Sequence, residues 1–354
     1  MASSRSKRVV GLLVGLGVSA LALALVLRRL SPAELGAALG AVSWGWLAPM
    51  AALRLTSMAL RARRWRRTLG ALQPRRYTYV FAAVGLGAAA NIALPFKLGE
   101  LLRVGLLKRH NPGVGTGDAL ATVAAERAVD GAILGLAALL ALPFVAAPGW
   151  MWRGAGLLFA IMLTVAAAGA LGPVHRWVSR RLPARGVLGL GRRVVLAFSR
   201  GTQVLRRPVD LAAITGWTAL IWVCEASILW CAVRAAGHIL AVPAALVVTL
   251  LYAVGLLVPS APGQLGTHQA LAVALLGPLG IAAAPAVSAS IVLQATTVTV
   301  LGLIGAAVVL GESRLRALVA ESGLADAGGG AREDGAAAAP EADPQGRRGV
   351  EPRP

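Results

Sequence analysis

Long apolar runs recur along this chain, and they limit its fold more than any other feature. Runs of about 18 or more residues, the length that a helix needs to cross a bilayer core, alternate with clusters of Arg. The runs are continuous and rich in Ala and Leu, which argues against membrane-spanning strands. Because 57% of the residues are hydrophobic and the mean hydropathy is +0.71, we predict an all-α, polytopic membrane protein.

The net charge of +20 does not indicate a nucleic-acid partner. The Arg clusters lie between apolar runs, as the positive-inside rule predicts for cytoplasmic loops. Residues 173–208 carry nine Arg and no acid, so we assign them to a basic cytoplasmic loop. Eight of the 15 acids follow residue 310, and the few acids left in the membrane part therefore become candidates for buried or functional roles.

The spacing of the runs predicts about six full spans and two re-entrant helical hairpins. Residues 9–27 form the first run, which we interpret as a retained span rather than a signal peptide because it continues into Arg28 without a convincing cleavage site. Residues 1–316 form the predicted transmembrane domain, and residues 317–354 a disordered tail. Both termini are predicted on the cytoplasmic side of the cell (inner) membrane.

Residues 91–103 contain the first predicted helix break. Pro95 and Gly99 interrupt an otherwise apolar region, and Lys97, Glu100 and Arg103 follow one another at three-residue steps. A charge facing lipid costs roughly 2.5–3.5 kcal/mol or more at the bilayer centre, and broken backbone at that depth requires protein or a water-filled cavity around it. We therefore expect this segment to line a cavity.

A second break resembles the first. Residues 95–99 and 262–266 share the pattern Pro-x-x-Leu-Gly. The predicted topology brings the first hairpin in from the cytoplasmic side and the second from the opposite side. Paired interrupted segments of opposite orientation indicate an inverted repeat and a binding site near the membrane midplane.

Three motifs carry a resemblance to a known family. They are Asn-x-x-Leu-Pro-x-Lys-x-Gly-Glu-x-x-Arg (91–103), Glu-Arg-x-x-Asp (126–130) and Pro-Gly-x-Leu-Gly-Thr-His (262–268). In this order they resemble the lysylphosphatidylglycerol synthase transmembrane-region family, whose flippase-like members include the lipid-flipping half of multiple peptide resistance factor. The resemblance implies re-entrant helices and the handling of lipid headgroups. Two positions depart from the family's usual residues: Lys97 replaces Arg, and Gln269 replaces Glu, which removes a potential ion-pair or proton partner.

The candidate substrate-binding residues come from these motifs and from one acid within a later span. They are Asn91, Lys97, Glu100, Arg103, Glu126, Arg127, Asp130, Glu225, Gly263, Gly266 and His268. Lys97 and Arg103 suit a phosphate, with Glu100 orienting them. The alternative is a buried charge network that fixes the turn, with Arg127 pairing with Glu100 or Asp130. Arg54 and Glu225 suit an ion pair, and His268 is either titratable or a hydrogen-bonded turn residue.

We expect a lipid flippase-like transporter or headgroup-binding protein for a phospholipid or a polyprenyl-phosphate lipid. No metal spacing and no cofactor motif is evident, so we predict neither. The aminoacyl transfer of the family's synthases belongs to a separate soluble domain, which we do not expect residues 317–354 to form. The alternatives are a membrane transferase acting on a lipid-linked substrate, and a scaffold for a membrane enzyme that makes the lipid.

Overall fold

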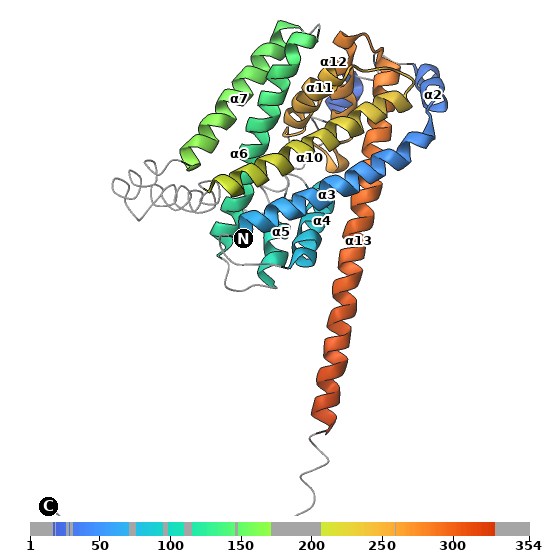
Figure 1. Cartoon of the computed structure of the whole chain (residues 1–354). Helices are drawn as coiled ribbons and strands as arrows, with labels where there is room; N and C mark the ends of the chain where they lie inside the picture. The colour runs from blue at the N-terminus through green and yellow to red at the C-terminus, as the bar shows by residue number, and fades with distance from the viewer. Residues whose placement is uncertain are drawn as a thin grey trace, which may run out of the picture. The chain divides into compact units, whose positions relative to one another are not determined.

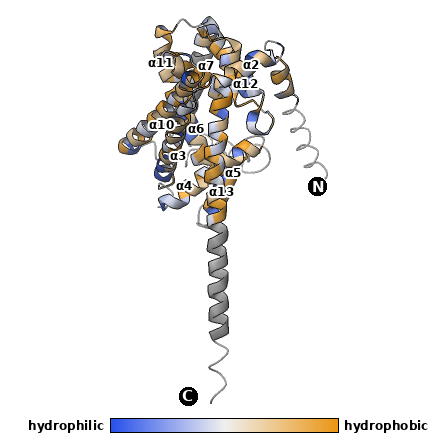
Figure 2. Ribbon diagram, turned by 90° about the vertical axis from the view of Figure 1, so that its right-hand side faces the viewer, coloured by the Kyte–Doolittle hydropathy of each residue, from blue (hydrophilic) through white to orange (hydrophobic). Residues whose placement is uncertain are grey.

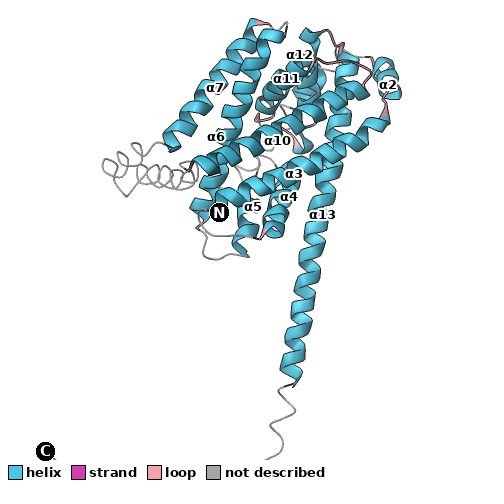
Figure 3. Cartoon of the chain, viewed as in Figure 1, coloured by secondary structure: helices cyan, strands magenta, loops and turns pink. Residues whose placement is uncertain are grey.

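The structure is a computed structural model in which every described element is a helix (Figure 3). It describes residues 17, 19–25, 28, 31–70, 76–94, 98–109, 115–145, 148–170, 207–258 and 260–329. The chain divides into two compact units, residues 1–308 and residues 309–354. The ion pairs and the cavity described below all lie in the first unit.

The helices of the first half are α2 (Pro32–Gly40), α3 (Leu47–Gly70), α4 (Tyr77–Ala93), α5 (Gly99–Arg109), α6 (Thr116–Ala141) and α7 (Gly149–Ala170). Those of the second half are α10 (Pro208–Ala235), α11 (Val242–Gly255), α12 (Thr267–Leu276) and α13 (Ala283–Gly329). Short 3₁₀ turns join some of them, namely η1 (Trp44–Trp46), η3 (Leu142–Phe144), η5 (Pro262–Gln264) and η6 (Gly277–Leu279).

Three described helical segments are long and apolar enough to cross a membrane: Thr116–Phe144, Pro208–Ala235 and Ala283–Gly311. Helices α2 and α3 reach that standard only as a pair, and the chain bends by 66° between them. The all-α membrane class is therefore confirmed, whereas the count of six full spans stays a prediction. The first predicted span and the basic loop lie largely outside the described residues.

The start of α2 and the end of the last helix show how the sequence sets the limits of the helices. Ser31 caps α2, because its hydroxyl accepts from the backbone N–H of Glu34 while the Glu34 carboxylate accepts from that of Ser31. The last helix is longer than expected. It runs to Gly329, so residues 317–329, assigned above to a disordered tail, are helical.

Pairs of helices build the first unit (Figure 1). The most extensive contacts join α3 to α10, α6 to α7 and α4 to α5. One apolar core cluster includes Met50, Ile228 and Leu250, and a second includes Trp65 and Leu107. Large apolar side chains are also exposed, and several Arg and acidic side chains are buried. Figure 2 colours the ribbon by hydropathy and shows apolar residues throughout the helices. This distribution is the one expected of a bundle that faces lipid.

Both predicted helix breaks are present. Helices α4 and α5 are 17 and 11 residues long and are separated at Leu94–Leu98, and α11 and α12 are 14 and 10 residues long. Each is shorter than the roughly 20 residues that span a bilayer. Lys97, the first candidate cation, lies outside the described residues together with Pro95 and Phe96.

Glycine lets the two arms of the first break approach closely. A Cβ on Gly87 of α4 would lie 2.8 Å from the Gly99 carbonyl oxygen and 2.9 Å from Arg103 Cβ. A Cβ on Gly99 would meet the Gly87 carbonyl oxygen and lie 2.6 Å from Asn91 Oδ1. Asn91 Oδ1 also accepts from the Gly99 backbone N–H at 2.8 Å, which holds the start of α5 against the end of α4. The hairpin therefore depends on a residue without a side chain at position 99.

Gly99→Ala should lower the free energy of unfolding by about 1–3 kcal/mol, the usual cost of forcing atoms into a packed site. Gly105→Ala is the matched control, because Gly105 lies in the same helix and a Cβ there would meet no atom within 4 Å. It should be neutral or stabilising by up to about 1 kcal/mol through helix propensity. Unfolding of the two purified variants in an SDS titration checks this, and equal stability would show that the close contact is unimportant.

Candidate functional site

A cavity lies where the two helix breaks meet. It has a volume of about 320 Å³, near the lower end of the range of about 300–1,000 Å³ usual for small-molecule sites. The first break contributes Asn91 and Glu100 to its lining, and the second contributes Gly263 and His268. Helix α4 also contacts η5 directly. The expectation that the segment around residues 91–103 lines a cavity is thus confirmed for its described part.

Seven of the eleven candidate residues line this cavity: Asn91, Glu100, Arg103, Arg127, Glu225, Gly263 and His268. Glu126 and Asp130 are buried but are not part of its lining. Gly266, with φ of +81°, begins α12 and packs closely on Ser19 and Leu23. The role of these residues in binding substrate stays a prediction.

Six charged residues form a closed ring of alternating sign, which we call the charge ring. Arg64 comes from α3, Glu100 and Arg103 come from α5, and Glu126, Arg127 and Asp130 come from α6. The contacts around the ring are Arg64–Glu126 (3.1 Å), Glu126–Arg103 (2.8 Å), Arg103–Glu100 (3.5 Å), Glu100–Arg127 (2.7 Å), Arg127–Asp130 (3.2 Å) and Asp130–Arg64.

The charge ring is deepest at Arg64, whose side chain is 1% exposed, and shallowest at Arg127, whose side chain is 48% exposed. Arg64 also donates to the Thr218 hydroxyl of α10 at 2.9 Å. The Arg103 guanidinium stacks over the Trp65 ring, 4.0 Å from its centroid. Every charge of the ring thus has oppositely charged neighbours on both sides, which fits the alternative reading of a network that fixes the turn.

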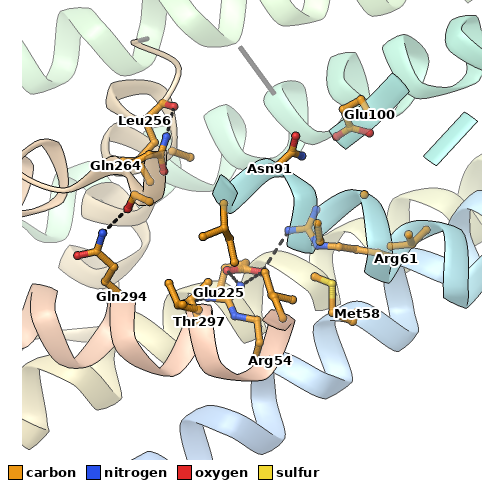
Figure 4. A pocket seen from close by; sticks show the side chains of 18 of the residues that line it. Arg54, Met58, Arg61, Asn91, Glu100, Glu225, Leu256, Gln264, Gln294 and Thr297 are labelled. Carbon is orange, nitrogen blue, oxygen red and sulfur yellow. Dashed lines mark hydrogen bonds and ion pairs between the residues drawn. The ribbon is translucent and has the colours of Figure 1, made fainter. Parts of the chain in front are cut away.

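A second, smaller charge cluster surrounds Glu225. Arg54 Nη1 donates to both carboxylate oxygens of Glu225, at 2.8 and 2.7 Å, which confirms the predicted ion pair. The Ser57 hydroxyl and Arg61 Nη2 donate to Glu225 Oε1, at 2.8 and 3.1 Å. Arg54 Nη2 also reaches the Thr297 hydroxyl of α13 at 3.1 Å. Figure 4 shows Arg54, Arg61, Glu225 and Thr297 close together at the cavity.

Two Gln side chains hold the second break. Gln269 Oε1 accepts from the Gly266 backbone N–H at 2.7 Å, and Gln269 Nε2 donates to Gln294 Oε1 at 3.0 Å. Gln294 Nε2 in turn donates to the Gly263 carbonyl. A Glu at position 269 could accept from Gly266 but could not donate to Gln294 Oε1. Through Gln294, Gln269 therefore ties the turn to α13.

His268 is fixed by Tyr252 of α11. Tyr252 Oη lies 2.9 Å from His268 Nδ1 and also 2.9 Å from the His268 carbonyl oxygen. The two rings lie 5.3 Å apart, centroid to centroid. This is the hydrogen-bonded turn residue that the sequence offered as an alternative, although the ring still lines the cavity.

Sequence reasoning missed Arg61 and Arg64. It assigned both to the basic cluster that marks the cytoplasmic side, yet Arg61 lines the cavity and Arg64 belongs to the charge ring. A signal for them existed, because residues 54, 57, 61 and 64 are three or four apart and so share one face of a helix. Assigning each Arg of the cluster to a face of the helix would have separated Arg61 and Arg64 from the exposed Arg63 and Arg66.

Comparison with protein families agrees with this architecture. The profile of the lysylphosphatidylglycerol synthase TM region matches residues 12–305. The chain belongs to this family. The matched range contains the whole charge ring and every residue that lines the cavity. A comparison with curated proteins gave no match. The protein is thus a membrane protein of a family associated with lipid handling, and the motifs that suggested this resemblance were interpreted correctly.

Glu126→Gln should destabilise the protein strongly. The carboxylate lies between Arg64 and Arg103, and removing one partner of a buried ion pair costs roughly 3–5 kcal/mol because the opposite charge stays buried. Arg67→Gln is the control, because Arg67 pairs with Asp210 at the surface and exposed pairs contribute about 0–1 kcal/mol. An SDS titration measures both. Equal losses would show that the ring does not carry the stability assigned to it.

Proposed function

We propose that this protein moves or holds a phosphate-bearing lipid headgroup in the cavity between its two helix breaks, without covalent chemistry. The observation that carries this proposal is that both breaks contribute to a single charged cavity. Charged groups and interrupted helices at membrane depth are typical of substrate pathways. The headgroup occupies the cavity while the acyl chains remain in lipid.

The lining suits an anion. Four Arg side chains and two acidic side chains belong to it, counting the described residues: Arg54, Arg61, Arg103 and Arg127 against Glu100 and Glu225. Three buried N–H groups of lining residues, Arg54 Nε, Arg103 Nε and Trp222 Nε1, have no hydrogen-bond acceptor in the described part of the chain. Phosphate oxygens are strong acceptors that suit such donors. The expected substrates are therefore anionic phospholipids or lipid-linked phosphates.

Val298→Trp should block headgroup movement. Val298 of α13 lines the cavity, so a large side chain there fills part of the space that a headgroup would occupy. Leu303→Trp is the control, because Leu303 lies on the same helix, is 67% exposed and does not line the cavity. Each protein is reconstituted into proteoliposomes that contain fluorescent short-chain phospholipids with different headgroups. Quenching by dithionite then measures the rate at which the lipids move between the two leaflets.

We expect flipping by the wild type and by Leu303→Trp, and a rate near that of protein-free vesicles for Val298→Trp. Equal rates for all three proteins would place the lipid route elsewhere. If no lipid is flipped by the wild type, the transport proposal fails. A membrane transferase would then be tested by its need for a lipid-linked substrate, and a scaffold by constant co-purification with a membrane enzyme.

We also propose that the protein lies in the cell membrane with both termini in the cytoplasm, as the basic segments at residues 61–67 and 173–208 suggest. Fluorescent-protein and alkaline-phosphatase fusions after Pro354 test this. We expect fluorescence and no phosphatase activity there. The same phosphatase inserted between Val145 and Pro148, on the predicted outer side, should be active. The reverse pattern would contradict the orientation.

A further inference from the structure

The two charge clusters at the cavity differ in net charge. The charge ring contains three Arg and three acidic residues, so its charges cancel. The cluster around Glu225 contains two Arg, Arg54 and Arg61, and one acid. Among the residues of the two clusters, the positive charge without a balancing acid therefore lies beside Glu225; Lys97 of the motif at residues 91–103 is outside the described residues.

Within this cluster, Arg61 is the less firmly held cation. Arg54 makes two short bonds to Glu225 and a third to Thr297, so it links three helices, α3, α10 and α13. Arg61 has one bond to Glu225, at 3.1 Å, and a long one to Ser57 within its own helix, at 3.4 Å. Glu225 would keep three hydrogen bonds if Arg61 left it. The unbalanced charge can therefore be assigned to Arg61.

The position of Arg61 gives that charge access to a ligand. Its side chain is 15% exposed, lines the cavity and extends toward Glu225 from α3 (Figure 4). A buried charge without a full partner is costly, and an anion entering the cavity would remove that cost. Arg is also suited to bind phosphate through two parallel N–H bonds.

We infer that Arg61 is the residue that binds the phosphate of the ligand. Before the ligand binds, Glu225 holds Arg61 in place, and the phosphate then replaces the Glu225 carboxylate as the partner of Arg61. This inference rests on the proposed function, since it names the group that takes the headgroup in that cavity. The ligand chemistry is a phosphate ester anion. Arg54 Nε and Trp222 Nε1, two of the three buried N–H donors without acceptors among the described lining residues, lie on residues of the same cavity, and the third is Arg103 Nε of the charge ring.

The first test compares Arg61→Gln with Arg66→Gln. Both remove one positive charge from α3, but Arg66 is exposed and does not line the cavity. Binding of short-chain fluorescent phosphatidylglycerol to the purified full chain in neutral detergent is followed by anisotropy. We expect the Kd to rise roughly tenfold or more in Arg61→Gln, the usual effect of losing a charged hydrogen bond, and to stay unchanged in Arg66→Gln. The Kd of Arg61→Lys should lie between those of Arg61→Gln and Arg66→Gln, because Lys keeps the charge but not the two parallel bonds.

The second test uses Glu225→Gln, which removes the competitor for Arg61 while keeping its shape. If Glu225 and the phosphate exchange on Arg61, this variant should bind phosphatidylglycerol more tightly than the wild type. A merely structural cluster would instead weaken binding in both Arg61→Gln and Glu225→Gln. Gel filtration of each variant checks folding. If Arg61→Gln does not fold, the test still holds, because the Kd for phosphatidylglycerol should rise in Arg61→Lys and fall in Glu225→Gln.

The outcomes separate the two proposals. If the wild type neither binds nor flips phosphatidylglycerol or any other phospholipid, the proposed function fails and this inference fails with it. If the wild type binds and flips lipid but Arg61→Gln binds as well as Arg66→Gln, only the role of Arg61 is wrong. Glycerol 3-phosphate and inorganic phosphate serve as soluble competitors. Displacement of the lipid by millimolar glycerol 3-phosphate would support recognition of the phosphate itself. Binding of glycerol 3-phosphate that is lost in Arg61→Gln, in a wild type that binds no phospholipid, would support Arg61 and overturn the lipid as the source of the phosphate.

Discussion

The charge ring is the constraint on which the rest of the first unit depends. Charges in a low-dielectric interior are tolerated only when each is paired and hydrogen-bonded. The alternation of three Arg and three acids pairs every charge with an opposite one, and it fixes the relative position of α3, α5 and α6. Because α5 is only 11 residues long, its two ring members, Glu100 and Arg103, hold a helix that could not keep its place by spanning the bilayer.

Helix α13 connects the other parts of the cavity. Gln294 bonds to the turn of the second break, and Thr297, one turn later, bonds to Arg54. The turn at Gly263 and the ion pair at Glu225 are therefore both tied to one helix, at positions one turn apart. The first break is held by a different device, the charge ring. The two breaks thus share a cavity but have separate anchors, which would allow one to move while the other stays fixed.

Much of this fold could be predicted from the sequence because its signals are local. Apolar run length gave the membrane class, and Pro and Gly within apolar sequence gave the position of both breaks, with charges beside the first only. Arg54 and Glu225 were paired correctly because each is a lone charge within an apolar run, where an opposite charge is the simplest partner. Arg64 could not be paired in this way. It lies among five Arg in seven residues, and its partners Glu126 and Asp130 are more than 60 positions away.

Two Arg side chains of α3, Arg61 and Arg64, differ in how firmly their neighbours hold them. Arg64 and Arg61 are one turn apart on α3, and both contact acids. Arg64 has two carboxylates and a Thr hydroxyl as acceptors and almost no exposed surface, so releasing it would leave several buried groups without partners. Arg61 shares its single carboxylate with Arg54 and faces the cavity. A basic cluster at the end of a span can therefore set topology, lock the fold and bind an anion, with each task assigned by helical face.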